Sequence, residues 1–275
     1  MDAIETIVFT LSMTLTARFF AKWYRPIAML WPNGRGRMAK VVIGSLPAVV
    51  LLVVLPVLLT LASFDVVGSP FFVLFYLLLG YPCLWFGVFA MRCFFDISLA
   101  DDILQMNNKS ALLAFVGGFL GITAIYCAAN VGDGPGWWCV IFAGGLGMAA
   151  WVALALAAGR LTQAFERVTV GRDIRCGIRF GCFLLAIGII FGRASSGDWT
   201  SASMTVVEFM DGWPALPLAL AVVARERLFA GSAEHGRDAV EGGLVGSIAW
   251  GALLVVVALA CALMVPPLFA KPPIG

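Results

Sequence analysis

Eight long apolar runs dominate this sequence and limit the folds open to it. They lie at about residues 4–21, 41–63, 71–91, 111–129, 137–159, 176–194, 204–224 and 243–269. One helical crossing of a hydrocarbon core about 30 Å thick takes about 20 residues. Because the runs are continuous and do not alternate between apolar and polar positions, they predict helices and not barrel strands. We therefore expect an all-α membrane protein of eight transmembrane helices, forming a single transmembrane domain over residues 1–275.

The composition agrees with a membrane protein and argues against other classes. Hydrophobic residues make up 61% of the chain and charged residues 12%, whereas soluble domains average about 45–50% and about 25%. A formal net charge of +2 is too small to indicate a nucleic-acid partner. The expected partners are therefore membrane lipids.

Basic residues occupy every second connection between the apolar runs. They are Lys22, Arg25, Arg35, Arg37 and Lys40 after the first run, Arg92 and Lys109 after the third, Arg160, Arg167, Arg172, Arg175 and Arg179 after the fifth, and Arg225, Arg227 and Arg237 after the seventh. Lysine and arginine near helix ends are retained on the cytoplasmic side. The other connections, at 64–70, 130–136 and 195–203, are short and rich in Gly, Pro, Ser and Asp, as expected of tight turns. This alternation predicts a multi-pass membrane protein with its basic connections in the cytoplasm and both termini outside.

One spacing, of about 65 residues, recurs along the chain and suggests an internal repeat. The set Gly171, Arg172, Asp173, Gly177 and Gly181 reappears at this displacement as Gly236, Arg237, Asp238, Gly242 and Gly246. The pair Gly132 and Asp133 reappears at the same displacement as Gly197 and Asp198. We interpret one period as a helical hairpin and expect repeats at about 41–105, 106–170 and 171–235, with a partial copy at 236–275.

Pairs of glycines four residues apart mark faces where helices can pack closely. The pairs are Gly117 with Gly121, Gly177 with Gly181, Gly188 with Gly192, and Gly242 with Gly246. Small residues at this spacing let two helix backbones approach each other. The pattern is typical of helix packing inside one chain, and the alternative is a homo-oligomer held through the same faces.

Two charges fall at the same expected depth in neighbouring spans. Arg193 lies 14 residues beyond Arg179, and Asp211 lies 14 residues before Arg225, so both should lie about 21 Å from the basic ends of their helices. An unpaired charge in hydrocarbon costs about 3 kcal/mol or more. We therefore expect Arg193 to pair with Asp211, or with Glu208 one turn away.

The same region contains more acids than bases. Asp198 lies on the adjoining turn, and Pro214 and Pro217 free carbonyl groups of the seventh helix, as in the broken helices at transporter ion sites. Arg193, Asp198, Glu208 and Asp211 are thus a candidate pocket for a proton or a small cation. The alternative is that the seventh helix starts late and leaves these side chains in water.

Arg172, Arg175 and Arg179 cover about two turns at the start of the sixth span. Such a cluster can bind anionic lipid or an acidic cytoplasmic partner protein. The setting of membrane topology explains it equally well.

The sequence shows no motif for catalysis, cofactor binding or metal binding. His235 is the one histidine of the chain, and no two of its seven cysteines are separated by only two residues. We expect no enzyme activity, cofactor or metal. Cys127 and Cys139 flank one outer turn. They are either free thiols or a disulfide.

Residues 95–199 also carry a family resemblance. The residues that carry it are Asp96, Ile97, Ser98, Leu99, Ala100, Asp101, Asp102 and Ile103, then Asn108, Ala111, Gly117 and Gly118, with a weaker echo at Asp173, Ile174, Gly188 and 194–197. This segment resembles the YjfL-like family of domain-of-unknown-function proteins (number 350). The resemblance implies a bacterial inner-membrane protein of paired hairpins, with a role in envelope stress or in polyamine-linked operons, and supplies no catalytic residues.

Three functions are compatible with these features. The first is a membrane module, oligomeric or part of a membrane complex, that senses the state of the membrane or envelope and relays it to a cytoplasmic partner. The second is an ion channel or a secondary transporter for protons or small cations. The third is an accessory subunit of a larger membrane complex.

Overall fold

The computed structural model describes residues 3–29, 36–233, 243–266 and 268. Eight helices in these residues are long and apolar enough to cross a membrane, which confirms an all-α multi-pass membrane protein. They are α1 (Ala3–Met29), α2 (Arg37–Thr60), α4 (Pro70–Phe94), α5 (Lys109–Ala129), α6 (Trp137–Thr162), α8 (Ile174–Ser195), the interrupted span Ala202–Leu228 and α11 (Gly243–Met264).

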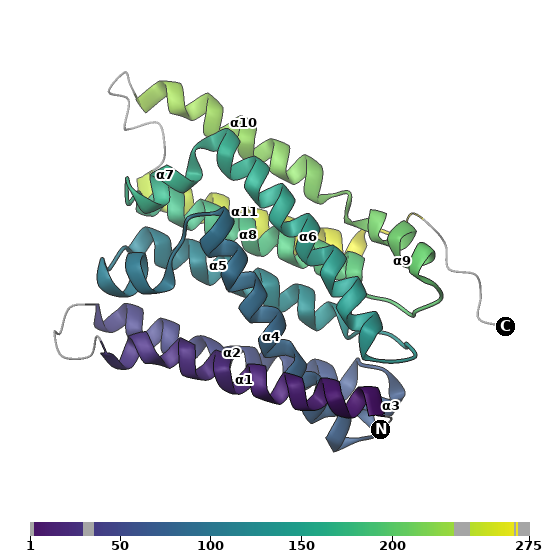
Figure 1. The fold of residues 1–275 in the computed structure, drawn as a ribbon. Helices are drawn as coiled ribbons and strands as arrows, with labels where there is room; N and C mark the ends of the chain where they lie inside the picture. Colours follow the sequence, from purple (N-terminus) through teal and green to yellow (C-terminus); the bar gives the residue numbers. More distant parts are fainter. Residues whose placement is uncertain (1–2, 30–35, 234–242, 267, 269–275) are drawn as a thin grey trace.

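Successive spans run in alternate directions through one bundle (Figure 1). We call the end that holds α3 (Phe64–Val67), the turn at 130–136 and α9 (Ala202–Glu208) the turn end. The opposite end holds the π-helix η2 (Leu99–Gln105) and α7 (Ala164–Thr169), and we call it the basic end. In Figure 1, α1 and α2 lie along one side of the bundle, α10 (Ala215–Ala233) lies along the other, and α5 and α8 lie between them.

Helices α5 and α8 begin with the same local structure. The side chain of Asn108 accepts hydrogen bonds from the N–H groups of Ser110 and Ala111, and the side chain of Asp173 accepts from those of Arg175 and Cys176. Such caps satisfy donors that have no partner within the helix. The residue before each cap is left-handed, with φ of 49° at Asn107 and 51° at Arg172. These equivalent positions lie one repeat period apart, although the division of the chain into hairpin repeats stays a prediction.

The glycine faces bring α5 and α8 into close contact inside one chain. A Cβ atom on Gly117 would lie 2.1 Å from the carbonyl oxygen of Gly181, and one on Gly188 would lie 2.4 Å from the Cα of Gly121. In the same interface Gly177 meets Ser110, and Gly192 meets Ala124. These six glycines therefore serve intramolecular packing, and their faces are not free for a second copy. Gly246 lies in α11, and Gly242 lies outside the described residues.

Large side chains fill the bundle around this central pair. Phe115, Phe119 and Phe183 are fully buried, and so is Trp151 of α6, whose indole N–H donates to the carbonyl of Leu184 at 2.8 Å. The outer spans instead expose large apolar side chains, as expected of helices that face lipid. The molecule is thus most tightly packed at α5 and α8.

The seventh span is broken near the turn end. Helix α9 stops at Glu208, a 3-10 turn η3 covers Phe209–Gly212, and α10 begins at Ala215 after Pro214. A proline has no N–H to donate to the preceding turn, which favours an interruption here. The break changes both the rise and the rotation of the chain from those of a straight helix.

Candidate functional site

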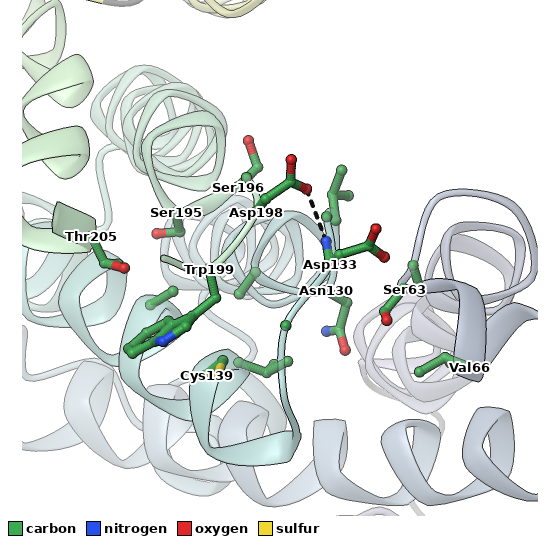
Figure 2. Close-up of a pocket in the computed structure, with 18 of the residues that line it drawn as sticks. Ser63, Val66, Asn130, Asp133, Cys139, Ser195, Ser196, Asp198, Trp199 and Thr205 are labelled. Atoms are coloured by element: carbon green, nitrogen blue, oxygen red, sulfur yellow. Dashed lines mark hydrogen bonds between the residues drawn. The ribbon is translucent and has the colours of Figure 1, made fainter. Parts of the chain in front are cut away.

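Three connections meet at the turn end and enclose a small polar pocket. Its polar lining includes Ser63 near α3, Asn130 and Asp133 of the turn at 130–136, Ser195 at the end of α8, Asp198 of the connection after it, and Glu208 of α9. Figure 2 shows Asp133 and Asp198 side by side, with Asn130 and Ser63 below them and Trp199 to one side. The pocket is therefore built from parts of the chain that are far apart in the sequence.

Hydrogen bonds between carboxylates and backbone join the connections. Asp198 Oδ1 accepts from the N–H of Asp133 at 2.9 Å (Figure 2), and Asp133 Oδ1 accepts from the N–H of Phe64 at 3.3 Å. The N–H of Trp199 donates back to the carbonyl of Asp133 at 2.7 Å. A hydrogen bond to an ionised acceptor is stronger than a neutral one. The charge on Asp198 therefore helps to hold the connection after α8 to the turn at 130–136.

The two turns approach so closely that only glycine fits between them. Gly132 has φ of 108° and Gly197 has φ of 137°, values that residues with a side chain rarely adopt. A Cβ on Gly132 would also lie 2.5 Å from the backbone of Gly197. The repeated Gly-Asp pairs thus have a defined role, because the glycine makes the close approach and the aspartate supplies an acceptor.

The size and charge of the pocket limit what it can bind. Its volume is about 50 Å³, which holds a few waters or a small ion and no organic substrate. Asp133, Asp198 and Glu208 contribute carboxylates, and the described residues that line it include no lysine or arginine. No three acidic, cysteine or histidine side chains of the described residues are grouped closely enough to hold a metal ion. The pocket is therefore acidic and large enough to hold water.

The expected ion pair of Arg193 is wrong. Asp198 and Glu208 line the pocket, but Arg193 and Asp211 do not. The carboxylate of Asp211 accepts from the N–H of Leu268 at 2.8 Å, and Arg193 forms no salt bridge with any described residue. Estimating depth from a constant rise per residue assumes a straight helix. The 3-10 turn at Phe209–Gly212 breaks that assumption and turns Asp211 toward the chain after α11.

A second charged site, which the sequence did not reveal, lies near the basic end. Arg179 of α8 meets Glu226 of α10 through two hydrogen bonds, Nε to Oε1 at 2.6 Å and Nη2 to Oε2 at 3.0 Å. Its Nη1 donates to the hydroxyl of Ser247 on α11 at 2.8 Å. Arg179 is 3% exposed and Glu226 8%. One side chain therefore joins three spans in a place that excludes water.

Further charges surround this pair. Arg167 of α7 contacts Glu226 at 2.8 Å and Asp173 at 2.9 Å, and Arg225 contacts Glu226 at 3.0 Å. Burial raises the pKa of Asp173, but the hydrogen bonds from Arg167 and from the N–H of Cys176 and the positive charges nearby lower it by more. The pKa of Asp173 therefore lies below its ordinary value. We call Arg167, Asp173, Arg179, Arg225 and Glu226 the buried charge cluster.

This cluster corrects one expectation about the arginines. Arg179 does not face lipid or a partner protein, because it is buried against Glu226. Arg172 is exposed and lies 3.4 Å from the sulfur of Met106, and Arg175 is partly exposed. Contact with lipid or a partner stays a prediction for these two. The sequence signal for the cluster was Glu226 itself, an acid between Arg225 and Arg227 at the end of an apolar span.

The cysteines give no sign of a covalent link. Cys127 and Cys139 are buried free thiols in the structure, so the disulfide alternative is not realised there. His235 lies outside the described residues.

Comparison with known proteins returned no relative. No family model, no curated protein and no solved structure matches this chain. The fold by itself defines the class, a multi-pass α-helical membrane protein. The resemblance of residues 95–199 to the YjfL-like family stays a prediction.

Proposed function

We propose that this protein is a non-enzymatic sensor of the bacterial inner membrane, in which α8 couples the pocket at the turn end to the basic end. One observation carries the proposal. The chain of α8 leads into Ser195 and Asp198 at the pocket, and the same helix carries Arg179 in the buried charge cluster. A rigid helix with a polar contact at each end is a physical link between two sites.

Protons are the input that the pocket favours. Protonation of Asp198 would remove the charge from the oxygen that accepts the N–H of Asp133, and would so weaken the contact between two connections. Glu208 lines the same pocket from α9, and its protonation would also remove a negative charge from the pocket. The connection after α8 would then be held less tightly to the turn at 130–136, with the backbone hydrogen bond from Trp199 to Asp133 remaining.

The basic end provides the output. The connections between the described spans are short, so we propose that the signal leaves through the basic residues at this end. The buried charge cluster joins α7, α8 and α10, and Arg179 also bonds Ser247 of α11, so a displacement of α8 would act on the other three helices. With the basic end in the cytoplasm, Arg172 and Arg175 are the side chains that we propose to meet an acidic partner protein or anionic lipid.

A secondary transporter for protons or small cations is the second candidate. The break at Phe209–Gly212, next to Glu208, favours it, because transporters place interrupted helices at ion sites. Against it, Phe119, Ile122, Phe183 and Ile187 are fully buried apolar side chains of α5 and α8, away from both charged sites. These side chains place apolar groups on α5 and α8 between the two charged sites.

Spin-label distances test the sensor. Labels at Arg172→Cys and Arg227→Cys, in a background without the native cysteines, report the position of α8 relative to α10 in nanodiscs. We expect the distance distribution to change between pH 7 and pH 3.5, a range that spans the ordinary pKa of an aspartate, about 3.9, and Asp198→Asn to give the acidic distribution at both values. Asp65→Asn, which alters an acid at the same end outside the pocket, should behave as the unaltered protein.

The same variants separate the two candidates. A distance distribution that does not depend on pH in the unaltered protein contradicts the sensor. Proton flux into liposomes that disappears in Asp198→Asn and Glu208→Gln, but not in Asp65→Asn, supports transport instead.

A further inference from the structure

A second cavity lies between α1, α4 and η2 near the basic end, on the side of the bundle away from the buried charge cluster. Its volume is about 840 Å³, within the range of about 300–1,000 Å³ that is usual for ligand pockets. Phe86 and Phe89, which form part of its wall, are 58% and 55% exposed. In a membrane-spanning bundle, such exposed apolar side chains border the lipid, so we call this cavity the lateral groove.

Two cations line the lateral groove without an acidic partner. Lys22 of α1 lies over the ring of Trp85, with its Nζ 4.7 Å from the ring centre. Arg92 of α4 lines the same groove. Neither side chain forms a salt bridge with any residue that the structure describes. The groove therefore presents positive charge that the protein itself does not neutralise.

The neighbouring acids are already engaged or lie beside the groove. Asp102 accepts from the N–H of Ser98 at 2.8 Å, and Asp101 accepts from the hydroxyl of Ser98 at the same distance. Asp96 is exposed and is not part of the lining. Arg18 and Arg25 lie one turn on either side of Lys22 on α1, so they add positive charge near the same face.

The polarity of the groove changes along its length. Helices α1 and α4 run in parallel, with Thr16 donating to the carbonyl of Leu78 at 2.8 Å. Leu15 and Phe19 therefore lie deeper in the membrane than Lys22, and Arg92 lies two turns beyond Trp85, about 10 Å closer to the basic end. From the membrane interior toward the basic end, the groove thus presents apolar side chains, then tryptophan, then cations. This order matches that of acyl chain, interface and headgroup in a lipid.

We propose that the lateral groove binds one anionic phospholipid of the surrounding bilayer. Lys22 and Arg92 bind its phosphate from two sides, and an acyl chain lies along Leu15, Phe19 and Phe86. A second copy of this protein is a poor occupant, because the same face would bring the same unneutralised cations together. This site is separate from the turn-end pocket, and the inference does not depend on the proposed sensor.

Lipid binding to charge-neutralised variants tests the proposal. Native mass spectrometry of the detergent-solubilised protein, titrated with phosphatidylglycerol or phosphatidylcholine, measures the affinity for each. For Lys22→Gln/Arg92→Gln we expect about 30-fold weaker binding of phosphatidylglycerol, since each cation near a lipid surface contributes about 1 kcal/mol. Binding of phosphatidylcholine should change little.

Two control variants make that result specific. Lys109→Gln/Arg160→Gln removes the same charge from exposed side chains at the basic end outside the groove and should leave binding unchanged. Lys22→Arg/Arg92→Lys keeps both charges and should retain at least a third of the affinity. Equal losses in the two glutamine variants, or equal affinity of the unaltered protein for both lipids, would overturn the proposal.

Fluorescence places the lipid independently of these substitutions. Brominated phosphatidylglycerol quenches tryptophans that its chains touch, and Trp85 and Trp23 line the groove. We expect brominated phosphatidylglycerol to quench a smaller fraction of the emission in Trp85→Phe than in the unaltered protein. In the unaltered protein, brominated phosphatidylcholine should quench less of the emission than brominated phosphatidylglycerol does. Quenching that is the same for both lipids, or unchanged in Trp85→Phe, places no anionic lipid at this groove.

Discussion

Replacing Glu226 by glutamine tests how much the bundle depends on the buried charge cluster. Glutamine keeps the shape of the side chain but removes its charge. Arg179 would then remain 3% exposed with no carboxylate against its guanidinium, and Arg167 would lose one of its two acidic contacts. A buried cation without a counter-charge destabilises the fold, because it has lost its hydration and has no attraction to an opposite charge to compensate.

The size of the effect follows from that burial. Breaking a buried pair by removing one partner costs about 3–5 kcal/mol. For chains of about 150–250 residues, 1 kcal/mol lowers Tm by about 2–4 °C, so we expect Glu226→Gln to lower Tm by about 6–20 °C. Arg179→Met/Glu226→Leu removes both charges and fills the same space. The Tm of this double variant should lie closer to that of the unaltered protein than the Tm of Glu226→Gln does.

Thermal unfolding in detergent micelles, followed by intrinsic fluorescence, measures these differences. Glu166→Gln is the matched control, because Glu166 is an exposed glutamate of α7 next to Arg167 and forms no salt bridge with a described residue. Its Tm should change by less than about 2 °C, as expected of an exposed substitution. The reasoning fails if Glu226→Gln and Glu166→Gln shift Tm equally, or if the double variant is less stable than Glu226→Gln.

Three further predictions concern other parts of the fold. Gly181→Ala places a Cβ 2.5 Å from the carbonyl oxygen of Leu113 and should destabilise by about 1–3 kcal/mol in unfolding assays, whereas Gly145→Ala meets no atom within 4 Å and should be neutral or stabilising. The pKa of Asp173 is lowered in the folded protein, so its ionised carboxylate stabilises the fold fully above its unfolded pKa of about 3.9. This stabilisation is lost as the pH falls below that value. The decrease in Tm between pH 5 and pH 3 should therefore be smaller in Asp173→Asn than in the unaltered protein. Cys93 is exposed at the basic end of α4, and a membrane-impermeant maleimide should label it in inverted vesicles and not in right-side-out ones if that end faces the cytoplasm.

Several details of the structure were readable from local sequence. The apolar runs give the eight spans, because crossing a bilayer demands a fixed length of apolar helix. The Gly-Asp pairs mark two turns in which the glycine has a positive φ. The glycine spacing on α5 and α8 marks their contact, since only residues without side chains let backbones come so close.

The pairing of charges could not be read in the same way. The expected partner of Arg193 was chosen by depth alone, which says nothing of the direction in which a side chain points or of which helix is its neighbour. The interruption at Phe209–Gly212 changed the direction of Asp211. Arg179, expected at the surface, instead faces Glu226, because α10 and α11 pack over that side of α8.

The sequence alone therefore determined the number of spans, the end of the bundle that carries the basic residues, and the places where the chain turns, because each depends on a short stretch of residues and on the thickness of the bilayer. Tertiary structure alone decided which charges meet, what lines the turn-end pocket, and that a lateral groove carries Lys22 and Arg92. Those features depend on the rotation of each helix about its axis and on its neighbours. These are set by the packing of side chains across the whole bundle.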